Sequence, residues 1–161
     1  MLRISKLTDY ATVILAHLAE DESARYAAAE LAGRTGIGVA TVSKLLKELS
    51  RAGLVVATRG PRGGYALARP AAAISAADII DAVEGPVGLT ECATQPGQCG
   101  IESTCRVGRS WQRVNVAIRR ALYDVKLTQL TGRDATVIAA PDLGAAVEHR
   151  VAFRPSMRVR A

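Results

Sequence analysis

The segment from residue 27 to residue 67 most constrains the fold of this chain. Residues 27–34 have the composition of a short helix, and the glycines of the following TGIG sequence interrupt it. The next segment, VATVSKLLKELSRAG (39–53), places its leucines and Val42 on one side and its basic and hydroxyl residues mostly on the other, and Gly53 ends it. Two helices joined by a glycine-containing turn, the second basic and amphipathic, predict a helix-turn-helix.

A β-hairpin is predicted directly after the second helix. Residues 54–58 are a short β-branched run, residues 59–64 have the turn sequence RGPRGG, and residues 65–67 are a second short strand. The glycines let the backbone approach another surface closely. A hairpin in this position is a wing, so Arg59 and Arg62 are predicted to contact phosphates or the minor groove of DNA.

Positive charge is concentrated in the same part of the chain. The net charge is +6, and residues 34–69 hold seven basic residues against one acid, Glu48, whereas residues 1–33 and 70–88 are net acidic. Such a patch is typical of a phosphate-binding surface, although a solvated basic face is the plainer alternative. Because recognition helices present their N-terminal residues to base edges, we predict the following DNA contacts: Thr41, Ser43, Lys44, Lys47, Arg59, Arg62, Gly63 and Tyr65.

Two further helices flank this segment. Residues 6–20 have apolar groups at helical spacing, with Thr8 or Asp9 as the expected cap and Asp9 facing outward. Residues 74–84 are predicted to form a helix capped by Ser75.

A long helix is predicted near residues 109–126. Its apolar stripe has no obvious partner within the chain, so we expect it to pair with a second copy; packing back on its own domain is the alternative. The stripe consists of Trp111, Val114, Ile118, Leu122 and Val125.

Length and hydrophobic content limit the organisation of the chain. At 161 residues and 49% hydrophobic content, one compact domain is expected. The predicted fold is mainly α with a small β-hairpin wing: a winged helix-turn-helix domain plus a long dimerisation helix. The expected parts are the DNA-binding domain (1–88), a cysteine loop (89–107), the dimerisation helix (108–131) and a variable tail (132–161) that we expect to be mobile.

All three cysteines of the chain, Cys92, Cys99 and Cys105, lie in one Gly/Pro/Thr-rich loop. Isolated reduced cysteines are usually buried in a core, whereas clustered thiolates on a loop can bind a soft metal or an iron–sulfur cluster. The chain starts without an apolar leader and has no run near the roughly 18 apolar residues of a membrane span. We therefore expect a cytoplasmic protein without membrane contact, whose thiols stay reduced. A zinc site and a metal-free thiol switch are the alternatives.

Over residues 1 to about 130 the chain resembles the winged-helix iron–sulfur regulators of the IscR- and NsrR-like family. The similarity lies in MLRISKLTDYA, GIGVATVSKLLKELSRAGLV, TRGPRGGYALAR, ISAADIIDAVEGP, the C-x6-C-x5-C loop and WQRVNVAIRRAL. The opening segment and GLTEC look most like regulators of the SUF iron–sulfur assembly system. The resemblance implies a homodimer that carries a [2Fe-2S] or [4Fe-4S] cluster and binds a palindromic operator in double-stranded DNA, as a repressor of cluster-assembly genes. A nitric-oxide- or iron-responsive regulator of the same family is the alternative.

The resemblance also implies a ligand set. Such clusters usually have four protein ligands, and the loop supplies Cys92, Cys99 and Cys105. IscR-like members use a histidine three residues after the last cysteine, where this chain has Gly108. NsrR-like members use an aspartate of the first helix of the partner subunit, and the matching residue here is Asp9.

Other groups could complete the ligand set or alter the specificity. Glu91, Glu102 or water could replace Asp9 as the oxygen ligand, whereas His17 and His149 are interpreted as ordinary helix or surface residues. Ser43 replaces a glutamate that helps IscR-like members to select bases, so their operator sequence does not carry over.

The sequence does not indicate an enzyme. It has no C-x-x-C pair, no phosphate-binding glycine loop and no plausible Ser/His/Asp set; a winged-helix adaptor protein is the remaining non-enzymatic alternative. The hypothesis is that a cluster at the root of the dimer helix fixes the angle between two winged domains, so that its loss changes the spacing of the recognition helices.

Overall fold

The computed structural model describes residues 4–60, 63–90, 93, 97, 99–101 and 104–131. Predictions that concern other residues lie outside the described residues; these are Arg62, Glu91, Cys92, Glu102, His149 and the tail 132–161. The elements are α1 (Lys6–Leu18), α2 (Ala28–Thr35), α3 (Val39–Arg51), β1 (Val55–Thr58), β2 (Gly64–Leu67), the short 3-10 helix η1 (Ala71–Ala73), α4 (Ala76–Glu84), α6 (Gly108–Asp124) and α7 (Leu127–Leu130).

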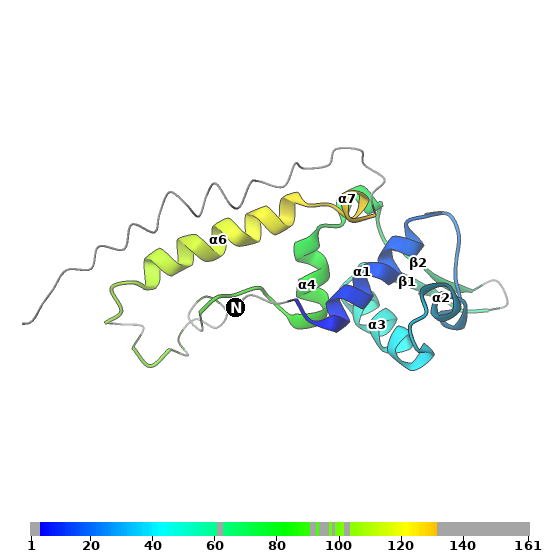
Figure 1. Cartoon of the computed structure of the whole chain (residues 1–161), viewed down its shortest axis with the longest axis horizontal. Helices are drawn as coiled ribbons and strands as arrows, with labels where there is room; N and C mark the ends of the chain where they lie inside the picture. Colours follow the sequence, from blue (N-terminus) through cyan, green and yellow to red (C-terminus); the bar gives the residue numbers. More distant parts are fainter. Residues whose placement is uncertain are drawn as a thin grey trace, which may run out of the picture.

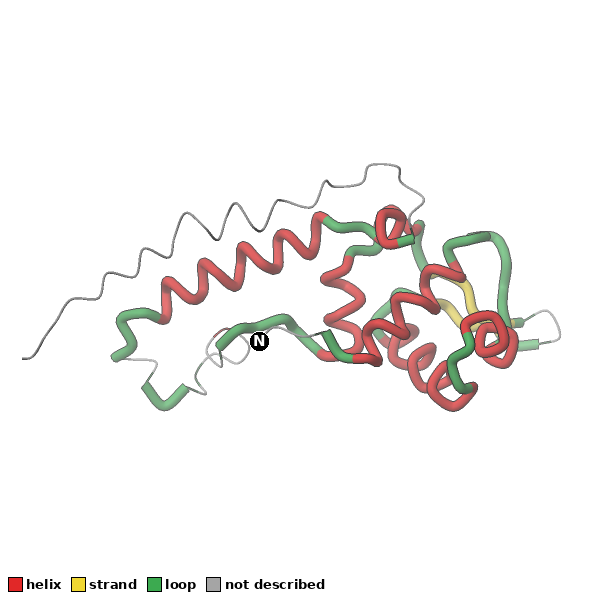
Figure 2. Tube along the Cα trace, in the orientation of Figure 1, coloured by secondary structure: helices red, strands yellow, loops and turns green. Residues whose placement is uncertain are grey.

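Helices α1 to α4 and the hairpin form a compact head, from which α6 projects (Figure 1). The prediction of a mainly helical fold with one antiparallel hairpin is confirmed (Figure 2). The core of the head is largely aliphatic, as the scarcity of aromatic residues requires, and α1 and α3 supply its largest shares. Its fully buried members on these two helices are Ala11, Ile14, Leu15, Leu18, Val42, Leu45, Leu46 and Leu49.

Side-chain caps fix where two of the head's helices begin. Ser5 caps α1 by accepting a hydrogen bond from the Thr8 amide at 3.3 Å, so the predicted cap at Thr8 or Asp9 is wrong. The helix begins at Lys6, the first residue of the predicted segment, and Asp9 faces outward as predicted. Ser75 caps α4, as predicted, in a reciprocal capping box with Asp78.

The wing is an antiparallel pair in which Thr58 lies opposite Gly64. The loop before α2 lies against it, because Tyr26 and Tyr65 exchange backbone hydrogen bonds of 2.9 and 3.0 Å. Gly64 permits this approach: its φ is +149°, and a Cβ there would lie about 3.0 Å from the Tyr26 backbone. The wing is therefore attached to the head through residues that precede it by almost forty positions in the chain.

The C-terminal end of α6 is anchored to the head. Ala76 donates to the carbonyl of Val125 at 2.9 Å, and Leu127 donates to the carbonyl of Ile74 at 2.8 Å. Leu127 is fully buried in the core. The helix ends at Asp124, so the prediction that Val125 continues its apolar stripe is wrong: that residue has extended backbone angles and belongs to the connection with the head.

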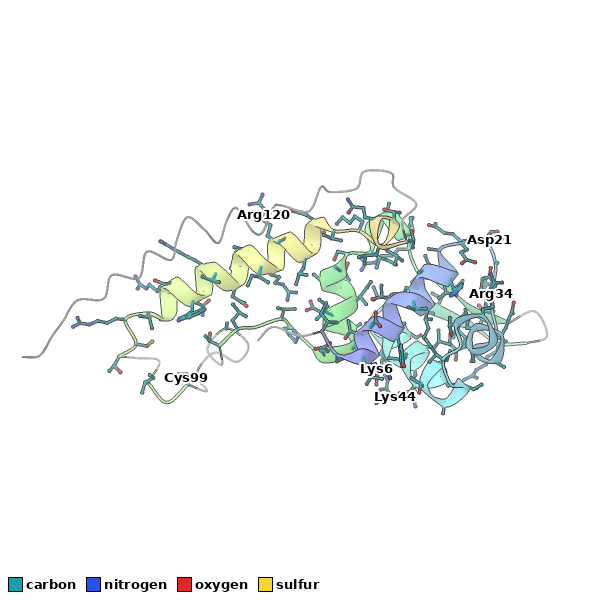
Figure 3. The ribbon with its side chains drawn as sticks, viewed as in Figure 1. Lys6, Asp21, Arg34, Lys44, Cys99 and Arg120 are labelled. Carbon is teal, nitrogen blue, oxygen red and sulfur yellow. The ribbon has the colours of Figure 1, made fainter. Side chains whose placement is uncertain are left out.

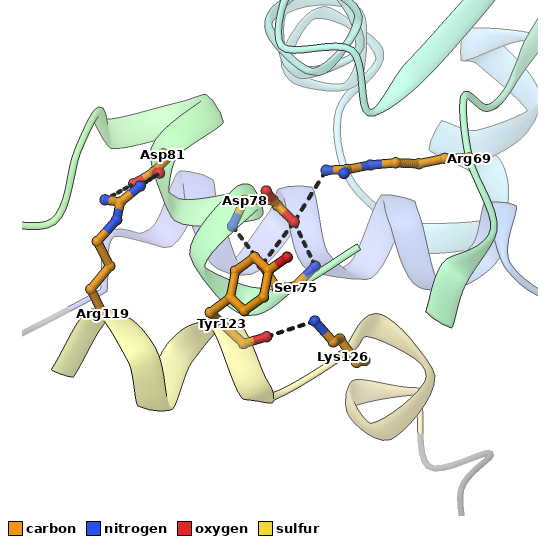
Figure 4. A network of polar contacts seen from close by, with 7 residues as sticks. All are labelled: Arg69, Ser75, Asp78, Asp81, Arg119, Tyr123 and Lys126. Atoms are coloured by element: carbon orange, nitrogen blue, oxygen red, sulfur yellow. Dashed lines mark hydrogen bonds and ion pairs between the residues drawn. The ribbon is translucent and has the colours of Figure 1, made fainter. Parts of the chain in front are cut away.

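A polar network supports this anchor (Figure 4). Arg119 on α6 forms a two-pronged ion pair with Asp81 on α4, with one N–O distance of 3.2 Å. Lys126 donates to the carbonyl of Tyr123 at 2.8 Å. The N-terminal part of α6 extends beyond these contacts (Figure 1). Among the described residues, no helix is long and apolar enough to cross a membrane.

Candidate functional site

Helix α3 presents a basic face to solvent while its opposite face closes the core. Lys44, Lys47 and Arg51 are exposed, and so are Ser43 and Val39 near its beginning. Four aliphatic side chains on the other side are fully buried, which fixes the rotation of the helix about its axis. The exposed face is therefore held in one orientation by core packing, as a surface that reads another molecule must be.

The beginning of α3 is left free of acidic groups. Gly38 precedes the helix, no side chain caps it, and its first turn contains no acidic residue. In contrast, α1 has Ser5 and Asp9 at its start. The positive end of the α3 dipole is thus not neutralised by its own first turn, which favours the approach of an anion.

Two of the seven basic residues counted in the sequence are structural. Arg34 pairs with Glu20 at 2.7 Å, and its guanidinium lies over the Tyr26 ring. Arg69 pairs with Asp78 at 3.1 Å (Figure 4). These acids lie outside the basic segment in sequence, so local counting could not find the pairs.

Lys44 keeps a charge that is available to a partner. It lies 3.9 Å from Glu48 in a loose pair, and its side chain is 60% exposed; surface pairs of this kind contribute little. Figure 3 shows Lys44 on the outer side of α3.

Asp78 is a structural acid of the head. Burial alone would raise the pKa of its carboxyl group, but hydrogen bonds from Ser75 and the nearby Arg69 charge bring that pKa below its ordinary value. The carboxylate therefore stays ionised, and it stabilises the start of α4 and the end of the wing segment together.

Of the predicted wing residues, Arg59 is exposed and available to a phosphate. Gly63 is needed for a steric reason: a Cβ there would lie 2.3 Å from the Thr58 carbonyl oxygen. Tyr65 is half-buried and packs against the core. The structure thus gives Gly63 and Tyr65 roles in building the wing, and their contacts with DNA stay predictions.

Sequence reasoning missed Arg25. It is exposed and donates a hydrogen bond to the Thr58 hydroxyl at the end of β1. Arg25 lies near the wing because it directly precedes Tyr26, whose backbone pairs with Tyr65 of the wing. The sequence gives no local sign of that pairing, so it could not predict where Arg25 lies.

The described part of the cysteine loop contains two of the three cysteines. Cys99 and Cys105 are free thiols, each partly exposed. Figure 3 places Cys99 beyond the head, on the side where α6 begins. Within the described residues, no three His, Cys, Asp or Glu side chains come together as a metal site; Cys92 lies outside that part of the chain.

Gly108, the first residue of α6, lies beside the sulfur of Cys105. A Cβ built on Gly108 would be 3.7 Å from that sulfur. A side chain at this position would therefore reach the surroundings of the Cys105 thiol.

Asp9 lies on the head. It lines an open groove of about 210 Å³ between α1, α4 and α6, together with Ile4, Ile80, Leu122 and Leu130. Figure 3 shows Lys6, at the start of the same helix, well separated from Cys99. Among the described residues, Asp9 does not come together with Cys99 and Cys105 as a metal site. His17 contacts Glu20, just beyond the end of α1, at 2.9 Å, in keeping with an ordinary helix residue.

Glu84 connects α1 to the segment that enters the cysteine loop. It accepts hydrogen bonds from the Thr8 hydroxyl and, at 2.9 Å, from the Ser5 amide. These bonds, that from Thr8 foremost, lower the pKa of the Glu84 carboxyl group. Gly85, with a φ of +85°, then turns the chain away from the head. Thr8, which the sequence suggested as a helix cap, is instead buried and bonded to Glu84.

The projecting helix α6 buries little of its own surface. The buried residue of α6 is Asn115. Its side-chain oxygen accepts a hydrogen bond from the Leu89 amide at 3.3 Å. Trp111 and Val114 of the predicted stripe are 46% and 43% exposed, whereas Ile118 and Leu122 are half-buried. The stripe is thus partly covered by the head and partly open.

Comparison with known proteins relates this architecture to transcriptional regulators. The family model for Rrf2, an iron-dependent transcriptional regulator, matches residues 4–133. A putative HTH-type transcriptional regulator of Azotobacter vinelandii is 32% identical over 133 residues, which cover 82% of this chain and 80% of that protein. The HTH-type transcriptional regulator IscR of Cereibacter sphaeroides is 32% identical over 134 residues, covering 80% of this chain and 86% of that protein.

A solved structure supports the same fold. CymR, the global cysteine regulator of B. subtilis, matches with a TM-score of 0.65 and 27% identity, covering 83% of this chain and 98% of that chain. These relatives are regulators of transcription and not enzymes, in agreement with the sequence prediction.

Proposed function

Because this chain belongs to the Rrf2 family of transcriptional regulators, we propose that it is a homodimeric repressor of iron–sulfur cluster assembly genes. It binds a palindromic operator and responds to an iron–sulfur cluster held by its cysteine loop. The observation that carries this proposal is the combination, in one short chain, of a DNA-reading head with a thiol loop at the end of a projecting helix (Figure 3).

The DNA-binding step is supported by the charges that remain available on the head. Lys44, Lys47 and Arg51 on α3 and Arg59 on the wing are exposed. Lysine and arginine contacts to phosphate provide most of the affinity, and the first residues of the helix provide the contacts to base edges. Thr41, Ser43 and Lys44 are the residues proposed to select the operator.

The dimer is supported by the open part of the α6 stripe. Trp111 and Val114 leave apolar surface exposed on a helix that the other described residues cover only in part. A symmetric pairing with a second copy would bury this surface and would place two recognition helices on one DNA face.

The cysteine loop fits an iron–sulfur cluster by the chemistry of its donors. Cys99 and Cys105 are reduced, partly exposed thiols, and soft thiolates are the usual ligands of such clusters. Cys92, Cys99 and Cys105 would hold the cluster, and Asp9 of the partner subunit would supply an oxygen donor. When bound, the group supplies a centre that is sensitive to iron supply, oxygen and nitric oxide.

The chain's own residues provide the connection between loop and head. The loop enters through Gly85, directly after Glu84, whose carboxylate holds the start of α1. The loop leaves through Gly108 into α6, whose far end is fixed to the core by Leu127. A loop held in one conformation therefore constrains both α1 and α6, and through them the angle between two heads.

Anaerobic purification tests this proposal directly. Wild-type protein is expected to be coloured and to contain iron and sulfide, and Cys105→Ser protein to be colourless. A gel shift with DNA from upstream of its own gene should give a complex. Zinc without iron would favour the zinc alternative, and a metal-free protein whose DNA binding follows thiol oxidation would favour the thiol switch.

A further inference from the structure

Arg25 lies at the turn end of the wing strands although it comes from the loop before α2. Its guanidinium donates a hydrogen bond to the Thr58 hydroxyl, and Thr58 is the last residue of β1. The next residue in the chain is Arg59, which is proposed to contact DNA. The structure thus places two arginines from distant parts of the sequence at one end of the hairpin.

The backbone near Arg25 is fixed by the wing itself. Its neighbour Tyr26 pairs with Tyr65 through two backbone hydrogen bonds, and Gly64 allows the close approach. Tyr26 is also buried in the core. Arg25 therefore begins from a fixed backbone position, so little backbone freedom is lost when it binds a partner.

The charge of Arg25 is available in a way that the charges of some other arginines are not. Arg34 and Arg69 are paired with the carboxylates of Glu20 and Asp78. The hydrogen-bond acceptor of Arg25 is instead the neutral hydroxyl of Thr58, and its side chain is exposed. A guanidinium has five N–H donors, so a bond to a hydroxyl leaves others for an incoming phosphate.

We propose that Arg25 is a phosphate contact of the operator complex, positioned by Thr58 beside the phosphate that Arg59 holds. This inference rests on the proposed DNA binding and extends the wing surface to a residue outside the hairpin. A phosphate contact fixes the register of the protein on the duplex without reading sequence, so Arg25 contributes to affinity for all duplexes alike.

The test compares two exposed arginines of equal charge. Arg25→Ala is compared with Arg120→Ala, which removes the same charge from α6, where Figure 3 shows the side chain on the face turned away from the head. Fluorescence anisotropy with upstream DNA is measured across a salt series. Arg25→Ala is expected to weaken binding about three- to tenfold and to lower the salt slope of the dimer by about 1.8, because each of the two subunits loses one phosphate contact worth about 0.9; Arg120→Ala is expected to leave the slope unchanged.

Two further variants separate contact from fold. Arg25→Lys keeps the charge and should retain the slope, and Thr58→Val, which removes the positioning hydroxyl, should weaken binding less than Arg25→Ala. Thermal melting of each variant verifies the fold. Equal slopes for wild type, Arg25→Ala and Arg120→Ala would overturn the inference while leaving DNA binding intact. A wild-type protein that binds no duplex at any salt would overturn both this inference and the proposed function.

Discussion

The head and the α6 arm of this protein differ in how they are stabilised. In the head, α3 alone buries four aliphatic side chains completely, and α1 and α4 begin at side-chain caps. In α6, which is longer than either, Asn115 is the buried residue, and Trp111 and Val114 remain exposed. Among the described residues, a continuous buried core holds the head together, whereas the arm is held by its anchored end and by the hydrogen bond between Leu89 and Asn115.

This difference indicates where regulation can act. A well-packed core resists small perturbations, since its contacts form and break together. A helix anchored at one end and open along its apolar face responds to whatever covers that face. The DNA surface therefore belongs to the rigid region, and the dimer contact and cysteine loop belong to the region whose state depends on partners.

The largest expected effect comes from the core of the head. Leu46→Ala removes a fully buried side chain from the inner face of α3 and should destabilise the protein by about 2–5 kcal/mol. Chemical denaturation followed by circular dichroism measures this loss. A change below about 0.5 kcal/mol would mean that α3 is not packed as described.

A charged side chain on the exposed apolar face of α6 should disrupt pairing of the arms without changing the fold of the head. Val114→Asp is expected to dissociate the dimer, because a carboxylate in the paired stripe would lose its hydration, while the circular dichroism of the head changes little. Val116→Asp is the matched control: it lies on the same helix, is 63% exposed, and is outside the predicted stripe. Sedimentation equilibrium should give monomers for the first and dimers for the second. The same mass for both variants would contradict the assignment of the stripe.

A smaller effect is expected from the wing. Arg59→Ala should cost about 1 kcal/mol of operator affinity and lower the salt slope by about one unit per subunit, because each subunit of the dimer loses one phosphate contact. Binding measured at several salt concentrations gives both quantities. An unchanged slope would place Arg59 outside the interface.

The smallest effect is expected at the contact between α1 and α4. The pKa of Glu84 is lowered in the folded state, first by the Thr8 hydroxyl, so this carboxylate stabilises the fold above its unfolded pKa of about 4.3. That stabilisation is lost as the pH falls through the lower folded-state pKa. Thr8→Val should therefore reduce the acid-dependent part of stability by less than about 1 kcal/mol. If the free energy of unfolding of wild type and of Thr8→Val changed with pH in the same way, the contact between Thr8 and Glu84 would be contradicted.

Much of the head could be predicted because its signals are local. Helical spacing of apolar residues located α1 and α3, glycine placed the turns, and Ser75 was correctly predicted as a cap. The cap at Ser5 was missed because it lies before the apolar pattern begins.

The details that depend on distant partners could not be predicted. Arg34 and Arg69 appeared free in the sequence but are paired with acids on other elements. Val125 continued a helical pattern, yet its carbonyl is used by Ala76 of the head. The role of each of these residues depends on a tertiary contact that no local sequence pattern encodes.

The central claim is that the state of the cysteine loop changes how the heads bind DNA. The most direct measurement is operator affinity of one anaerobic preparation before and after removal of its iron and sulfide, with metal content and visible absorption recorded on the same samples. We expect a coloured protein whose affinity differs at least tenfold from that of the colourless form, about 1.4 kcal/mol. Equal affinities for the two forms, or a reconstituted protein without colour and iron, would contradict it.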